Sequence, residues 1–207
     1  MKKLILTLAG VLFIVLSSAF SFWEKKERSH YIQQPDAEYT VEQYTGDDSY
    51  YIPGYGKTFL GFKEAIAFKE SQGRYHIINT LGYIGKYQFG VSTLSTLRIS
   101  NTEYFLYSSI LQEKAFMANC SYNKWLLHEE INQHVGSTIK GIQITESGII
   151  AAAHLAGAGS VKRFLRKKGK NKRIVDAYGT SIEQYLISFA NYDLTYIEPT
   201  RFPILNR

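Results

Sequence analysis

Helical periodicity is the feature that most constrains how this chain folds. Beyond the N-terminal segments, apolar residues recur at helical spacing in several stretches, and capping residues or glycines bound them. The first stretch covers about residues 59–71 and stops near Gly73. Phe62, Ile66 and Glu70 stand at i, i+4 and i+8, so they share one face of the predicted helix. A carboxylate therefore ends an otherwise apolar face.

A longer helix is predicted over about residues 110–135. Ser109 and Gln112 have the spacing of a capping box at its start, and Gly136 follows its end. Its apolar residues repeat at a spacing of four and three, as expected for a helix that covers a core. They are Leu111, Ala115, Ala118, Tyr122 and Trp125.

The last third of the chain also has helical signals. Thr145 can cap an Ala-rich helix that Gly157 ends, a further helix follows it, and Ser181 can cap the final one. Residues 75–78 are β-rich, and glycines follow them, which favours a small hairpin or an extended loop. We therefore expect a mainly α (α+β) domain with one small β excursion early in its sequence.

Residues 1–21 have the parts of an export signal: a basic start, an apolar run from Leu4 to Leu16, and the small residues Ala19 and Ser21. The alternative is an uncleaved helix that anchors the chain in the inner membrane. Both interpretations export the rest of the chain to the periplasm or cell envelope, and both confine membrane contact to this segment.

Residues 22–57 are polar and rich in tyrosine, and they read as a linker before one domain at 58–207. Apolar residues make up 45% of the chain, which is enough to fill the core of such a domain. The single cysteine, Cys120, excludes an intramolecular disulfide. The histidines lack metal-site spacing and no Walker loop is present, so we expect neither a metal nor a cofactor.

The formal net charge is +6, and it is concentrated in residues 162–173, which hold eight basic residues and no acid. Such a run could bind carboxylates of a wall polymer, acidic lipids or nucleic acid. We interpret it as a solvated loop that keeps an exported protein near acidic wall polymer. Nucleic acid is not an expected partner, and we expect a monomer.

Glu70 is the strongest candidate for chemistry. It stands at the C-terminus of its helix, where the helix dipole and partial burial both favour the protonated carboxyl. A general acid that works near neutral pH needs this property. The alternative is a structural or solvated glutamate at a helix end. Glu64 is expected on the opposite, solvent-exposed face among lysines.

Four short blocks give the sequence a likeness to a known family. They are "ESQGRY", "GKYQFG", "GIIAAAHLAGAGSV" and "EQYLISF", and they span about residues 59–193. In content and order they resemble the lysozyme-like lytic transglycosylases, which have the soluble-lytic-transglycosylase catalytic domain. The resemblance implies a lysozyme-like fold and peptidoglycan as the partner.

Carried over by position, the resemblance makes Glu70 the sole catalytic acid and base. Ser71 would orient it or contact the substrate, and Tyr185 would hydrogen-bond near its carboxyl. Gln88 and the neighbouring Tyr87 would line the glycan groove.

His154 stands where the family usually has a tyrosine, which places it among the candidate substrate-binding residues. Its position on an apolar face instead favours a core histidine with its hydrogen bonds satisfied.

The implied reaction is non-hydrolytic cleavage of the β-1,4 bond between N-acetylmuramic acid and N-acetylglucosamine, with a 1,6-anhydro product. A lysozyme-type muramidase would normally use a second carboxylate. Asp176, Glu146 and Asp193 are candidates for it, but none stands in a block that resembles a second catalytic site. A non-catalytic peptidoglycan-binding module on the same fold is the third possibility.

Overall fold

The structure is a computed structural model that describes residues 54–170, 179–203 and 205. All of these residues belong to one compact unit. The predicted export segment, most of the predicted linker and Asp176 lie outside the described residues. Within the described part, helices predominate and the only sheet has two strands, so the prediction of a mainly α domain is confirmed.

The first helix, α2 (Phe59–Ser71), has the predicted bounds. The Thr58 side chain accepts a hydrogen bond from the Gly61 N–H and so caps its start. Its end is a left-handed turn at Gln72 and Gly73, whose N–H groups reach back to Phe68 and Ala67. This termination leaves Glu70 in the last turn of the helix.

The predicted long helix is two helices, α5 (Ser109–Leu126) and α6 (His128–His134). The backbone leaves helical geometry at Leu127, whose side chain is fully buried. No glycine or proline marks this break, so the sequence did not indicate it. Trp125, expected in the apolar stripe, is 38% exposed.

The predicted capping box at the start of α5 is wrong. Ser108, not Ser109, is the cap, and its side chain accepts from the Leu111 N–H. The Gln112 side chain turns inward instead and is fully buried. It accepts from the Lys86 N–H and donates to the carbonyl oxygens of Tyr75, Phe105 and Leu106.

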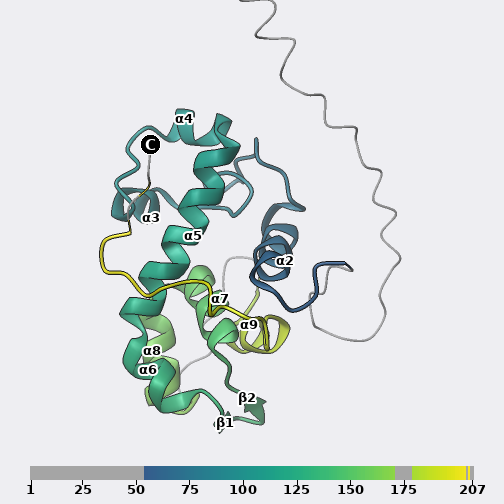
Figure 1. Ribbon diagram of the computed structural model, residues 1–207, viewed down its shortest axis with the longest axis vertical. Helices are drawn as coiled ribbons and strands as arrows, with labels where there is room; N and C mark the ends of the chain where they lie inside the picture. Colours follow the sequence, from purple (N-terminus) through teal and green to yellow (C-terminus); the bar gives the residue numbers. More distant parts are fainter. Residues whose placement is uncertain (1–53, 171–178, 204, 206–207) are drawn as a thin grey trace, which may run out of the picture. The chain divides into compact units, whose positions relative to one another are not determined.

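Two short helices were not predicted, α3 (Val91–Thr96) and α4 (Thr102–Tyr107). Each has six residues, which is too short for a clear helical period. Asn101 caps α4 through a bond from the Tyr104 N–H. In Figure 1 these helices lie near the N-terminal end of α5.

The early β segment agrees with the predicted extended loop, but the only sheet in the described residues was not predicted. The early segment forms isolated antiparallel bridges, Ile78 with Ile84 and Ile84 with Phe89. The sheet comes later, where β1 (Thr138–Ile139) pairs antiparallel with β2 (Ile142–Gln143). Figure 1 shows it near α6, at the other end of α5 from α4.

Three helices complete the domain: α7 (Glu146–Ala156), α8 (Ala158–Arg166) and α9 (Ile182–Ser188). The predicted caps are confirmed, since Thr145 accepts from the Gly148 N–H and Ser181 forms a full capping box with Gln184. Gly157 ends α7 as predicted. Residues 147–153 of α7 are all buried, because α5, α8 and α9 pack around this helix (Figure 1).

Aromatic side chains join the first and last helices in one core. The Phe62 ring lies 6.2 Å from Phe116 of α5, 6.3 Å from Phe189 and 5.7 Å from Tyr192. Aromatic pairs at such distances add to the free energy gained from burial. The core thereby holds α2 and α9 together, although they are far apart in sequence.

Within the described residues, no helix has the length and apolar content needed to cross a bilayer.

Candidate active site

Glu70 on α2 and Tyr185 on α9 meet through a hydrogen bond. The Tyr185 hydroxyl donates to Glu70 Oε1 over 2.5 Å, across 115 residues of sequence. Glu70 is half-buried and Tyr185 is 2% exposed. The contact implied by the family resemblance is therefore confirmed. Within the part of the chain that the structure describes, Glu70 Oε2 accepts no hydrogen bond, so the carboxyl group is held through one oxygen.

The position of Tyr185 depends on how closely α9 approaches α7. At Gly148 of α7, an added Cβ would lie 2.7 Å from the carbonyl oxygen of Leu186 and 3.2 Å from its Cα. Only glycine leaves room for this approach. The Tyr185 ring also packs 5.0 Å from Phe189, which joins the same helix to the core.

Ser71 joins the end of α2 to the turn formed by residues 85–88. Its hydroxyl donates to the Lys86 carbonyl oxygen over 2.7 Å, and Ser71 itself is buried. Gln88 has a left-handed backbone with φ 49°, and its side chain donates to the Gly85 carbonyl oxygen over 2.8 Å. The turn is therefore closed on itself and bonded to the residue that follows Glu70.

The structure places Tyr87 in the core, not on an open surface. Its ring stacks 4.1 Å from Phe116, and its side chain is fully buried. The hydroxyl donates to Glu113 Oε2 over 2.8 Å. This burial leaves the Tyr87 side chain no exposed surface for the glycan contact that the sequence suggested.

His154 is a partly buried histidine with both ring nitrogens bonded. Nε2 lies 2.8 Å from the Tyr87 carbonyl oxygen, and Nδ1 lies 3.2 Å from the Asn119 side-chain nitrogen. These partners fit one neutral tautomer, in which Nε2–H donates and Nδ1 accepts. The ring also packs edge-on against Phe89 and Phe116. The interpretation as a satisfied core histidine agrees with this placement.

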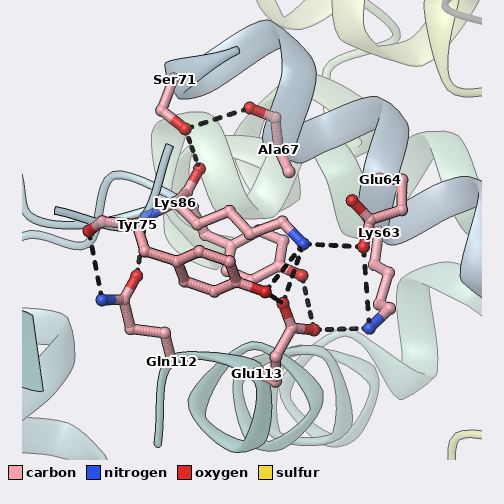
Figure 2. A network of polar contacts seen from close by, with 9 residues as sticks. Lys63, Glu64, Ala67, Ser71, Tyr75, Lys86, Gln112 and Glu113 are labelled. Atoms are coloured by element: carbon pink, nitrogen blue, oxygen red, sulfur yellow. Dashed lines mark hydrogen bonds and ion pairs between the residues drawn. The ribbon is translucent and has the colours of Figure 1, made fainter. Parts of the chain in front are cut away.

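A network of charged side chains, shown in Figure 2, holds the other side of the same turn. Lys86 Nζ lies 2.7 Å from Glu64 Oε1 and 2.9 Å from Glu113 Oε1. Lys63 Nζ and the Tyr75 hydroxyl also donate to Glu113. We call Lys63, Glu64, Tyr75, Lys86 and Glu113 the α2–α5 network, because they join α2, the turn and α5.

The network shifts the proton affinities of its members. Burial raises the pKa of Glu113, but hydrogen bonds from Lys63, Tyr75 and Lys86 outweigh it and lower this pKa to about 2. Burial and the bond to Glu113 raise the pKa of Tyr75 to about 12. The two carboxylates also raise the pKa of Lys86, although burial opposes them. Glu113 is therefore an anion and Lys86 a cation at neutral pH.

The α2–α5 network contradicts the expected place of Glu64. The side chain was predicted on the solvent face of α2, yet only 23% of it is exposed and it pairs with Lys86. Besides the neighbouring Lys63, its partner is Lys86, which lies 22 residues away in the sequence. Helix periodicity alone could therefore not predict this pair. The one available signal was Lys86, a charged residue in the turn that the family resemblance had already singled out.

The other candidate carboxylates have separate structural contacts. Glu146 pairs with Lys124 over 2.8 Å. Asp193 is exposed and accepts two bonds from Thr195, which lower its pKa. Within residues 54–170, 179–203 and 205, no three His, Cys, Asp or Glu side chains lie close enough to hold a metal ion.

Two hollows on the surface of the described residues are not lined by Glu70. One of about 500 Å³ is lined by Trp125, Leu126, His128, Glu129, Lys162 and Pro199. The other, of about 360 Å³, is lined among the described residues by four basic residues of the run 162–173. We base the candidate site on the Glu70–Tyr185 contact, because it joins two of the sequence blocks that carry the family resemblance.

Comparisons with protein-family models, with curated proteins and with solved structures find no match to this chain.

Proposed function

We propose that this protein is a lytic transglycosylase of peptidoglycan with a lysozyme-like catalytic domain. The observation that carries the proposal is the Glu70–Tyr185 hydrogen bond, which joins the two sequence blocks that resemble the catalytic blocks of that family. A glutamate fixed at the end of a helix, with one oxygen bonded and the other open, suits a group that both gives and takes a proton.

In the proposed reaction, Glu70 first acts as the acid. Its Oε2 donates a proton to the glycosidic oxygen between N-acetylmuramic acid and N-acetylglucosamine, and the C1–O bond breaks. The 2-acetamido group of the substrate stabilises the positive charge that develops at C1. The Glu70 carboxylate then takes the proton from the muramyl C6 hydroxyl, whose oxygen forms the new bond to C1. Atoms balance without water, and the product carries a 1,6-anhydro ring.

Tyr185 and Ser71 have positioning roles in this proposal. The Tyr185 hydroxyl holds Oε1, so the carboxyl group cannot rotate freely and Oε2 keeps its direction. Ser71 bonds the end of α2 to the turn that carries Gln88, which keeps the glycan groove and Glu70 in register. Gln88 and Tyr87 would then contribute to the groove mainly through the backbone of this turn.

The test is digestion of purified sacculi by the full-length protein, followed by mass spectrometry of the released fragments. We expect anhydromuropeptides, and we expect Glu70→Gln to reduce their release by at least about 10³-fold, because the amide cannot transfer the proton. Glu103→Gln is the matched control, since Glu103 is an exposed glutamate on α4; its activity should stay within about twofold of the parent.

Two other outcomes would replace the proposal. Fragments with reducing ends in place of anhydro rings would identify a muramidase. Binding to sacculi without any released fragment, and equal for the parent and Glu70→Gln, would identify a non-catalytic peptidoglycan-binding module.

A further inference from the structure

The basic hollow at the end of α8 is a built feature of the surface, and the proposed catalytic site does not use it. It has a volume of about 360 Å³ and is lined by Arg166, Lys167, Lys168 and Lys170. All four side chains are exposed. These four residues belong to the basic run 162–173. The whole run holds eight basic residues, and without them the chain would be slightly acidic.

The backbone around the hollow is fixed by hydrogen bonds. The N–H groups of Lys168, Gly169 and Lys170 donate to the carbonyl oxygens of Leu165, Phe164 and Lys167, each over 2.9 Å. Lys168 and Gly169 both have left-handed backbones, with φ 50° and 71°. This turn presents the lysines from a defined backbone, so binding costs less conformational entropy than it would from a mobile tail.

The turn is also packed against the β1–β2 connection. An added Cβ at Gly169 would lie 2.4 Å from Cδ of Lys140, so the Lys140 side chain lies directly over this glycine. Lys140 Nζ in turn pairs with Glu183 of α9 over 3.3 Å. The turn therefore contacts the β1–β2 connection directly, and Lys140 links it to α9.

The carboxylates near α8 are occupied by other cations. Glu130, with a side chain 1% exposed, accepts from Arg166 Nε over 2.9 Å and pairs with Lys162 over 3.5 Å. Arg166 also approaches Glu129. In contrast, no ion pair to Lys167, Lys168 or Lys170 is present in the part of the chain that the structure describes. The described residues thus place no carboxylate within ion-pair distance of these three lysines.

We propose that this basic hollow binds the carboxylates of peptidoglycan stem peptides and so holds the protein on its polymer. The inference rests on the proposed function for the identity of the polymer. A stem peptide that projects from a glycan strand can enter a hollow, and its carboxylate would meet Lys167, Lys168 and Lys170, which form no ion pair with a described residue. A lipid surface fits less well, because the described lining residues are all basic and stable interfacial binding needs buried apolar area as well as charge.

The experiment measures binding of the full-length protein to purified sacculi in the Glu70→Gln background, so that no polymer is degraded. Lys167→Gln with Lys170→Gln removes two charges from the hollow. Arg98→Gln with Arg163→Gln removes the same net charge from exposed residues that do not line it. We expect about a fivefold loss of affinity at low salt for the first pair. The control pair should lose less than twofold.

A second measurement needs no variant of the hollow. Sacculi whose carboxyl groups have been converted to neutral amides should bind more weakly than native sacculi, and the difference should shrink as salt rises from about 50 to 300 mM. Equal loss in the two charge-matched pairs, or equal binding to native and amidated sacculi, overturns the proposal. Loss of binding to phosphatidylglycerol vesicles, with unchanged binding to sacculi, overturns it in favour of a lipid surface.

The two proposals fail separately. If sacculi are not cut but binding depends on the hollow, the catalytic assignment is wrong and the docking surface stands. If anhydromuropeptides are released but the two variant pairs bind alike, only the docking surface is wrong.

Discussion

The Tyr185 hydroxyl fixes one oxygen of the Glu70 carboxyl, and Tyr185 has little freedom to move. Its side chain is 2% exposed and its ring lies against Phe189. A hydrogen bond to a carboxylate contributes about 1.5–3 kcal/mol when its geometry is held in this way. At the scale of single residues, this pair is the part of the site on which the proposed chemistry depends.

Tyr185→Phe removes the hydroxyl and keeps the ring. We expect turnover of sacculi to fall about tenfold or more, because the Glu70 carboxyl loses the bond that orients it. The free energy of unfolding should fall by no more than the contribution of this hydrogen bond, about 1.5–3 kcal/mol, since the packing of the ring is unchanged. Release of anhydromuropeptides and urea unfolding measure the two effects.

Tyr196→Phe is the control for this change, because Tyr196 is 73% exposed and its ring lies against Phe59. It should leave both measurements as they were. If Tyr185→Phe keeps full turnover, the hydrogen bond has no part in catalysis.

The sequence predicted the positions of some residues of the candidate site correctly and those of others incorrectly. Glu70 and Tyr185 came together as the family resemblance implied, and local signals had already predicted the helix that carries each of them. Tyr87 did not reach an open surface, because the left-handed Gln88 closes the turn and the Tyr87 ring stacks on Phe116. A resemblance between short blocks gives the order of residues, but it cannot give the direction of a side chain within a turn.

The contact between α7 and α9 controls the site at the scale of elements. Gly148→Ala would place a methyl group 2.7 Å from the Leu186 carbonyl oxygen, so α9 must move away from α7. We expect a loss of about 2 kcal/mol in the free energy of unfolding, together with lower turnover, because Tyr185 moves with α9. Thermal unfolding and digestion of sacculi measure these effects.

Gly159→Ala is the matched control for this strain. Gly159 lies in α8, and no atom lies within 4 Å of an added Cβ. The substitution should stabilise the protein by up to about 1 kcal/mol, because alanine favours a helix more than glycine does. A Gly148→Ala protein as stable and active as the parent would show that α9 is not held by this close approach.

Local signals placed most helix ends, but long-range contacts decided the rest. The caps at Thr145 and Ser181 were predictable, because each side chain accepts a hydrogen bond from the backbone N–H three residues later in the sequence. Gln112 had the spacing of a capping residue, yet its bonds to Lys86 and Tyr75 require contacts 26 and 37 residues away. The break at Leu127 likewise depends on burial of its side chain in a core assembled from distant helices.

At the scale of the whole molecule, the α2–α5 network joins the turn beside the candidate site to two helices. Each cation in it faces a carboxylate: Lys63 and Lys86 both contact Glu64 and Glu113. Removing one member of a buried pair leaves the opposite charge without compensation, which costs more than the pair itself contributes. Stability should therefore depend on the charge of Glu113.

The dependence on pH has a definite sign. The pKa of Glu113 is lowered from 4.5 to about 2 in the folded protein, so its carboxylate stabilises the fold fully above pH 4.5 and loses this effect as the pH falls toward 2. Glu113→Gln should cost about 2–3 kcal/mol at pH 6, and this difference from the parent should shrink steadily between pH 4.5 and pH 2.5. Urea unfolding across this range measures it, with the exposed Glu103→Gln as control. A difference that stays constant with pH would mean that the Glu113 charge does not hold the network together, and that the turn beside Glu70 is held by Ser71 and Gln112 alone.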